Sequence, residues 1–260
     1  MLKRVLLFAF ITFSLVDAQF ISSPSVLQRA EKFLQRYTES SDSTYTVYEV
    51  KGNIKLPMKV DVPIENFGGR YIINLNSGTR NIRVNDFEEF NLRKIASEDL
   101  RNYFNNEVLN SSKITRVAFE HQQRNGQSEI VGGIVMFHQL VQNVIVRGDA
   151  FIFLYYDALS NLKKIEYSWL NVKKKIKKID FCKECILESH MDKLEQEISR
   201  ISRDIKSENM QGELYDAVRS WRMTTDSSGN GILVPCLTYL GHFDDKGTIR
   251  YISFDVDEIF

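Results

Sequence analysis

The chain has 260 residues, and its 34 lysines and arginines are balanced by 34 aspartates and glutamates, so the formal net charge is zero. A neutral balance gives no indication of a nucleic-acid partner or of an acidic substrate. The length is sufficient for two or three small domains, each with a core of its own.

The first 18 residues have the pattern of a secretory signal peptide. A basic start at Lys3 and Arg4 precedes an apolar run of about a dozen residues, and the small residue Ala18 closes the segment. The run is well short of the roughly 20 residues that a membrane-spanning helix needs, although an anchor is the alternative. We therefore expect cleavage before Gln19 and a secreted or extracytoplasmic mature protein.

The remaining residues show one order of elements three times, a helix followed by several strands. The predicted units are 19–92, 93–178 and 179–260. In the first unit, apolar residues at helical spacing predict a helix over 24–37. Predicted strands of this unit cover 44–50, 71–75 and 81–84.

The second unit has the strongest strand signals. Its predicted helix covers 97–109, with Ser97 as the N-cap. Predicted strands cover 113–122, 130–141, 144–147, 150–156 and 162–172. Residues 151–156 are all apolar or aromatic, which predicts a central strand with both faces covered and a helix on one side. Gly132 and Gly133 lie inside a strand pattern and indicate a bulge.

The third unit has the clearest helix pattern, over 184–206, followed by predicted strands over 214–223, 232–240 and 248–254. The apolar stripe of the helix is narrow and short, which favours a helix on its own sheet over a coiled-coil seam. A lysine-rich run, residues 173–178, precedes this unit. We interpret the run as a solvated strand end and linker, and contact with an anionic membrane or polysaccharide is the alternative.

Three cysteines are present, an odd number for an exported chain. We expect a structural bridge from Cys236 to Cys182 or Cys185, and metal or redox chemistry at the Cys-x-x-Cys pair is the alternative. Asn110 begins an Asn-Ser-Ser triplet, which is a glycosylation site if the source is a eukaryote.

Patterns that indicate catalysis are mostly missing from the sequence. It has no His-Glu-x-x-His motif, no Gly-x-Ser-x-Gly elbow and no phosphate-binding glycine loop, so we expect no metal and no cofactor. A cysteine and a histidine that are distant in sequence could still meet as a nucleophilic pair. We nevertheless expect a protein that is not an enzyme.

Several segments of the second unit resemble the propeptide modules of secreted thermolysin- and fungalysin-type metalloproteases and the related PepSY modules. The resemblance lies in Phe137–Gln139, Asn143–Val146, Gly148, Phe151–Asp157 and Leu162, and again in Leu233–Pro235 and Asp244–Gly247 of the third unit. Val144 and Asn161 stand where the pattern has turn glycines.

The resemblance implies an α+β fold of tandem cystatin-like units, each a helix packed on a curved antiparallel β-sheet. It also implies a secreted, non-catalytic binding module that acts in trans on a protein partner, such as a secreted protease, as a propeptide-like inhibitor or chaperone. Strand edges and hairpin loops would dock into the partner. The partner would be neither a nucleic acid nor, through the lysine run, a membrane.

Residues 139–143 are also similar to the Gln-x-Val-x-Gly inhibitory hairpin of cystatins, with Asn143 in place of the glycine. This similarity makes Gln139, Val141 and Asn143 the candidate binding residues and cysteine-protease inhibition an alternative function. A structural or envelope-associated protein, assembling through the lysine run and the long helix, is the other alternative.

Overall fold

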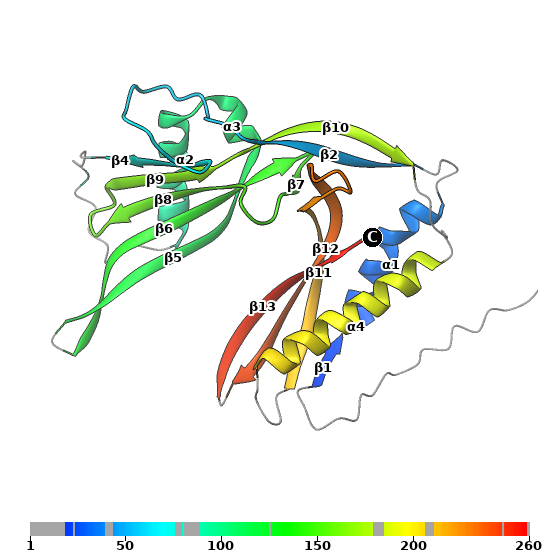
Figure 1. Cartoon of the computed structure of the whole chain (residues 1–260). Helices are drawn as coiled ribbons and strands as arrows, with labels where there is room; N and C mark the ends of the chain where they lie inside the picture. Colours follow the sequence, from blue (N-terminus) through cyan, green and yellow to red (C-terminus); the bar gives the residue numbers. More distant parts are fainter. Residues whose placement is uncertain are drawn as a thin grey trace, which may run out of the picture. The chain divides into compact units, whose positions relative to one another are not determined.

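The computed structural model describes residues 19–22, 24–39, 44–75, 80, 89–124, 126–178, 185–205, 211–245 and 247–258 (Figure 1). Within these ranges, four helices and mostly antiparallel strands form a protein of the predicted α+β class. The predicted signal peptide and the predicted strand over 81–84 lie outside the described residues. None of the described helices has the length and apolar character needed to cross a bilayer.

The chain forms two compact units, and each combines segments that are distant in sequence. The first contains residues 1–40, 181–218 and 237–260, and the second contains 41–180 and 219–236. Strands β11 (Gln211–Thr225) and β12 (Gly231–Asp245) therefore contribute residues to both units. The three predicted units were consecutive instead, because an alternating pattern marks a strand without indicating which distant strand it pairs with.

In the first unit, helices α1 (Pro24–Thr38) and α4 (Ile186–Ile205) pack together (Figure 1). Pro24 suits the first turn of α1 because that position has no intrahelical use for a backbone N–H. Strand β1 (Gln19–Ser22) pairs in parallel with β11, and β13 (Thr248–Asp257) pairs with β12.

The core of this unit contains residues from both helices and three strands: Val26, Ala30, Leu194, Leu214, Ala217, Leu237, Tyr239, Phe254 and Val256. Met191, Ile198 and Ile201 of the narrow α4 stripe pack against this cluster. The stripe therefore lies on the sheet of its own unit, as the sequence favoured.

The second unit contains a seven-stranded sheet with the order β3-β4-β9-β8-β6-β5, to which β7 adds beside β6 (Figure 1). The strands are β3 (Glu65–Phe67), β4 (Arg70–Asn74), β5 (Ser112–Arg124), β6 (Gln127–Val141), β7 (Val144–Ile145), β8 (Phe151–Asp157) and β9 (Leu162–Ser168). Strand β8 is central, as predicted. The β5–β6 register shifts next to Gly132, which confirms the predicted bulge.

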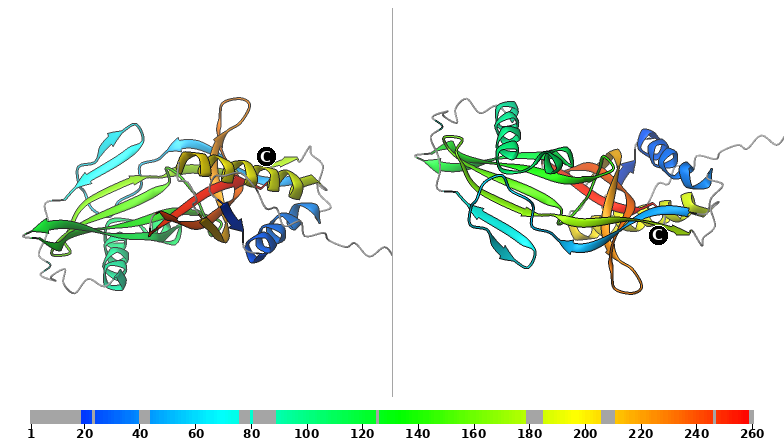
Figure 2. Two further views of the ribbon diagram at one scale, coloured as in Figure 1. Left: turned by 90° about the horizontal axis from the view of Figure 1, so that it is seen from below. Right: turned by 90° about the horizontal axis from the view of Figure 1, so that it is seen from above.

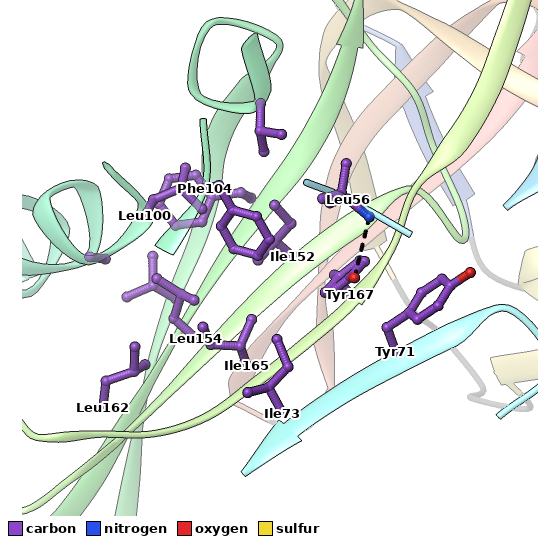
Figure 3. Packing of buried hydrophobic residues seen from close by; sticks show 14 of the residues in the cluster. Leu56, Tyr71, Ile73, Leu100, Phe104, Ile152, Leu154, Leu162, Ile165 and Tyr167 are labelled. Carbon is purple, nitrogen blue, oxygen red and sulfur yellow. Dashed lines mark hydrogen bonds between the residues drawn. The ribbon is translucent and has the colours of Figure 1, made fainter. Parts of the chain in front are cut away.

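Helices α2 (Glu89–Tyr103) and α3 (Asn106–Asn110) lie on one side of this sheet (Figures 1 and 2). Between helix and sheet, Leu100 and Phe104 pack with Ile152, Leu154 and other buried residues (Figure 3). The hydroxyl of Tyr167 accepts a hydrogen bond from the backbone N–H of Leu56 at 3.3 Å, which satisfies a polar group inside this apolar cluster (Figure 3).

The predicted start of the second helix was wrong. Helix α2 begins at Glu89, and Ser97 lies in its middle, where the hydroxyl donates to the Arg93 carbonyl at 2.8 Å. A serine that bonds back along the helix resembles a cap in sequence but does not begin a helix. The helix with a side-chain N-cap is α3: the side-chain oxygen of Asn105 accepts a hydrogen bond from the Val108 N–H at 3.0 Å.

A long antiparallel ribbon of β2 (Thr44–Asn53) and β10 (Leu170–Lys178) completes the second unit. Residues 231–233 of β12 pair with β2. Trp221 packs edge-on against Tyr48, with 5.1 Å between the ring centroids, and its indole N–H donates to the Val141 carbonyl at 3.0 Å. This contact joins the ribbon side of the unit to the end of β6.

Candidate functional site

The face of the seven-stranded sheet opposite α2 is the candidate site. Side chains of β8 alternate, so Ile152, Leu154 and Tyr156 enter the core beneath the helix while Phe151, Phe153 and Tyr155 lie on the other face. Register places further residues on this second face. We call it the open face and define it as Arg70, Ile72, Ile134, Met136, His138, Phe151, Phe153, Tyr155, Lys164 and Glu166.

An aromatic row runs along the centre of the open face. The ring centroids of Phe151 and Phe153 are 4.6 Å apart, and those of Phe153 and Tyr155 are 6.0 Å apart. Phe151 is buried, whereas Phe153 and Tyr155 are half-buried. Helix α2 packs on the opposite face, where it contacts β5 and β6. The row therefore offers partly accessible apolar surface at the middle of the sheet.

Two cations hold the ends of this row. The Arg70 guanidinium carbon lies 5.4 Å from the centroid of the Phe151 ring, and the Lys164 ammonium lies 3.9 Å from that of Tyr155. A cation over an aromatic ring is attracted by the ring quadrupole and contributes about 0.5–1 kcal/mol at an exposed site. These contacts restrict the motion of both rings and place positive charge beside them.

Glu166 connects the two cations. Its carboxylate lies 3.3 Å from an Arg70 nitrogen and 3.1 Å from the Lys164 ammonium, and it accepts a hydrogen bond from the Tyr155 hydroxyl at 3.1 Å. Burial, followed by the Glu166 charge, raises the pKa of Tyr155 to about 12, so this hydroxyl remains a donor at neutral pH. A carboxylate with three partners is a structural anchor rather than an available base.

His138 lies at the edge of the open face and is 6% exposed. Its Nδ1 atom is 2.7 Å from the Thr115 hydroxyl. Burial, and then the charge of Arg147, lowers the pKa of His138 to about 4, so the imidazole is neutral at physiological pH. Among the residues that the structure describes, no three His, Cys, Asp or Glu side chains gather as metal ligands would. The open face thus offers rings, cations and hydrogen bonds for binding.

The structure buries two of the three residues predicted to bind a partner. Gln139 is 4% exposed, and its side-chain amide both donates to and accepts from the backbone of Leu170 at 3.0 Å. Val141 is 6% exposed and its carbonyl accepts the Trp221 indole N–H. Neither side chain is available to a partner, and only Asn143 is exposed.

Asn143 belongs to a two-residue turn between β6 and β7. Gln142 and Asn143 have φ of 50° and 61°, which is the left-handed conformation that a type I′ hairpin needs at both central positions. Val144 therefore lies after the turn, in β7. The turn itself does not need a glycine at this position. Asn161 is the other position where the propeptide pattern has a turn glycine. Here the preceding residue, Ser160, takes the positive φ of 62°, and the Asn161 side chain accepts a hydrogen bond from the Arg80 N–H at 2.8 Å.

The remaining predicted sites have different outcomes. Cys236 is fully buried and reduced, with its sulfur 3.0 Å from the Ser220 hydroxyl, so the expected bridge from Cys236 is not formed. Cys182 lies outside the described residues, and Cys185 directly precedes α4. Asn110 is exposed at the end of α3, and its glycosylation stays a prediction.

Sequence reasoning did not find the charged part of the open face. Arg70, Lys164 and Glu166 come from two strands, and their contact with the β8 rings depends on the β4-β9-β8 order. The aromatic run of β8 was the one available signal. It was interpreted as a central strand with both faces covered and a helix on one side. Helix α2 does cover one face, and Phe153 and Tyr155 on the other face are half-buried.

Comparisons with known proteins complete these observations. No protein-family model matches the sequence, and the search of curated proteins finds no match. The chain is similar to a solved uncharacterized protein from Eubacterium rectale, with 6% identity, 90% of this chain and 79% of that chain covered, and a TM-score of 0.39. It is also similar to the YpeB C-terminal domain of Bacillus megaterium, with 12% identity, 90% and 98% coverage, and a TM-score of 0.32.

Proposed function

We propose that the chain is a secreted, non-catalytic binding module whose open face contacts a protein partner. The observation that supports this most is the half-buried aromatic row, braced by Arg70, Lys164 and Glu166. Aromatic residues, methionine and arginine are the types enriched where proteins meet. Rings that are already held in place also lose little conformational freedom on binding.

The propeptide resemblance supports a secreted protease as the partner, with the module acting as an inhibitor or chaperone in trans. In this proposal each helix on its antiparallel sheet corresponds to a cystatin-like unit. Export follows from the expected signal peptide. The cystatin-type hairpin is the less favoured route to inhibition, because Gln139 and Val141 are buried.

Photo-crosslinking tests the location of the contact. We would place p-benzoylphenylalanine at Phe153 on the open face or, as the control, at Phe90, which is 71% exposed on α2. Both positions are phenylalanines of the second unit. After irradiation in the medium of the secreting cell, we expect a specific protein adduct from the position of Phe153 and none from that of Phe90. Equal adducts, or none, would refute the open face as the contact.

Inhibition assays test the class of partner. The purified protein is incubated with metalloproteases and cysteine proteases, alongside Phe153→Ala and the control Phe90→Ala. We expect inhibition that weakens about tenfold in Phe153→Ala, the typical loss at an interface hot spot, and is unchanged in the control. Absence of inhibition, together with a concentration-dependent dimer in sedimentation, would favour the alternative of a structural assembly protein.

A further inference from the structure

Strand β10 carries a second feature, separate from the open face. It pairs along one side with β2, and no described strand pairs with its other side, which is therefore an edge (Figure 1). An edge strand presents a row of backbone N–H and C=O groups that can pair with another chain. The lysine-rich run, predicted as a solvated strand end and linker, is thus part of a sheet edge.

The side chains of this edge are positively charged on both faces. Lys173, Lys174 and Lys175 are exposed, and Ile176 is 68% exposed. Because side chains alternate along a strand, Lys173 and Lys175 lie on one face, and Lys174 and Ile176 lie on the other. Lys175 pairs with Glu49 of β2 at 3.2 Å, which fixes one lysine against the ribbon.

This alternation distinguishes between possible occupants. A planar anionic membrane can contact only one face of the ribbon, so it would leave either Lys174 or the pair Lys173 and Lys175 without a counter-charge. A second copy of this edge would place lysine opposite lysine, which is unfavourable. A strand added beside β10 has side chains on both faces, so acidic residues on it would meet lysines on both.

We propose that the edge of β10 binds an extended acidic polypeptide segment, which adds to the sheet as a further strand. Backbone hydrogen bonds supply the pairing, acidic side chains complement Lys173 and Lys174, and an apolar residue of the segment packs on Ile176. The lysines thereby exclude a like-charged edge and select an acidic one. This inference does not rest on the open face.

Fluorescence anisotropy with the full mature protein tests the proposal. The probe is a short fluorescein-labelled peptide, rich in glutamate and with valine at its centre. Its control has the same charge but two consecutive prolines in every four residues, which removes backbone N–H donors from both edges of the strand. We expect binding of the first peptide, weakened by raising salt from about 50 mM to about 200 mM, and about tenfold weaker binding of the proline peptide. Equal binding of both would overturn strand addition.

Variants locate the site. In Lys173→Glu/Lys174→Glu we expect at least about a tenfold loss of affinity, because attraction at two positions becomes repulsion. Lys94→Glu, at an exposed position of α2, is the matched control and should bind as the wild type. Unchanged binding in the double variant would place the peptide elsewhere and refute the proposal. Tighter binding of phosphatidylserine vesicles than of the peptide, lost in the double variant, would show a membrane site instead.

Discussion

The two units each bury a tyrosine hydroxyl between a helix and a sheet, but they satisfy it differently. In the first unit, Tyr239 lies 2.8 Å from Nε2 of His190 on α4, and Nδ1 of that histidine donates to the Asp257 carbonyl at 2.9 Å. In the second, Tyr156 donates to Asp99 on α2 at 3.1 Å. Arg80 holds the same carboxylate through two bonds of 2.6 and 2.7 Å.

The two hydrogen-bond networks therefore respond to different changes. The first network is neutral, since Nδ1 carries the proton, Nε2 accepts the tyrosine proton, and burial keeps the imidazole uncharged. The second is ionic and depends on the match between Asp99 and Arg80. Burial raises the pKa of both tyrosines, so neither hydroxyl ionises at neutral pH. Acid should therefore destabilise the fold through the His190 network, and loss of an ion-pair partner should destabilise it through the Asp99 network.

Removal of Asp99 gives the largest expected effect. In Asp99→Ala, the Arg80 guanidinium and the Tyr156 hydroxyl lose their partner together, which should lower the free energy of unfolding by about 4 kcal/mol. Denaturant unfolding measures the loss, and hydrogen exchange should place the lost protection in α2 rather than in α4. Asp99→Asn keeps an acceptor for Tyr156 and should cost less. Equal losses in the two variants would contradict the role given to the tyrosine bond.

Acid should destabilise the first unit through His190. Burial, which is opposed by the bond to the Asp257 carbonyl, lowers the pKa of His190 to about 4. The unfolded imidazole titrates near 6.5, so between these values the unfolded state binds the additional proton and stability falls as the pH falls. The loss should reach about 3 kcal/mol by pH 4 and be absent above pH 7. Unfolding titrations across this range measure it.

His190→Gln is the variant that isolates this contribution. Glutamine does not titrate, so the variant should take up about one proton fewer on unfolding near pH 5. His138 of the second unit also has its pKa lowered to about 4, by burial and then Arg147, and accounts for a similar proton that remains in this variant. If the free energy of unfolding depended on pH in this variant as it does in the wild type, His190 would not be held in the neutral form by burial.

Each unit has a glycine at which neighbouring atoms leave no room for a Cβ, and substitution by alanine allows the two to be compared. A Cβ at Gly241 would lie 2.8 Å from the Glu213 carbonyl oxygen and 2.7 Å from a Leu214 methyl. At Gly133 the one near contact is a Leu92 methyl at 2.7 Å. Side chains move more easily than backbone, so Gly241→Ala should cost about 3 kcal/mol and Gly133→Ala about 1 kcal/mol. Thermal unfolding measures both costs, and equal costs would show that the backbone contact at Gly241 is unimportant.

The smallest expected effect concerns a hairpin turn. The turn before β13 in the first unit already has Gly247, at φ 84°, whose N–H donates to Asp244 at 2.6 Å. The β6–β7 turn of the second unit has Asn143 at φ 61°. Asn143→Gly should therefore stabilise by about 0.5 kcal/mol, and Asn143→Ala should destabilise. Denaturant midpoints measure both, and a loss on introducing glycine would contradict the turn type.

Local structure was largely predictable from the sequence. Helices α1 and α4 and most strands begin and end within a few residues of their predicted bounds, because their apolar periods are long and uninterrupted. The start of α2 was missed because Ser97 has the residue type of a cap while its hydroxyl bonds to Arg93. The two-unit arrangement could not be predicted, since it depends on which distant strands pair.

The candidate site was predictable only in part. The β8 run indicated a central strand, and α2 on one side of it was expected. The contacts of Glu166 with Arg70 and Lys164 depend on strand order and register, which no local pattern contains. Gln139 and Val141 matched a known inhibitory hairpin motif, but both side chains are buried and are not available to a partner.

Because each unit combines distant segments, the order of synthesis determines when each core can fold. The Leu100–Ile152 core lies within one continuous segment and can form while the ribosome is still extending the chain. Val26 and Ala30 of α1 instead pack with Leu237, Tyr239 and Phe254, which lie far later in the chain, so α1 cannot bury its apolar side until those strands have been synthesised. During that interval its apolar side is exposed, which makes nascent α1 a natural client for a chaperone.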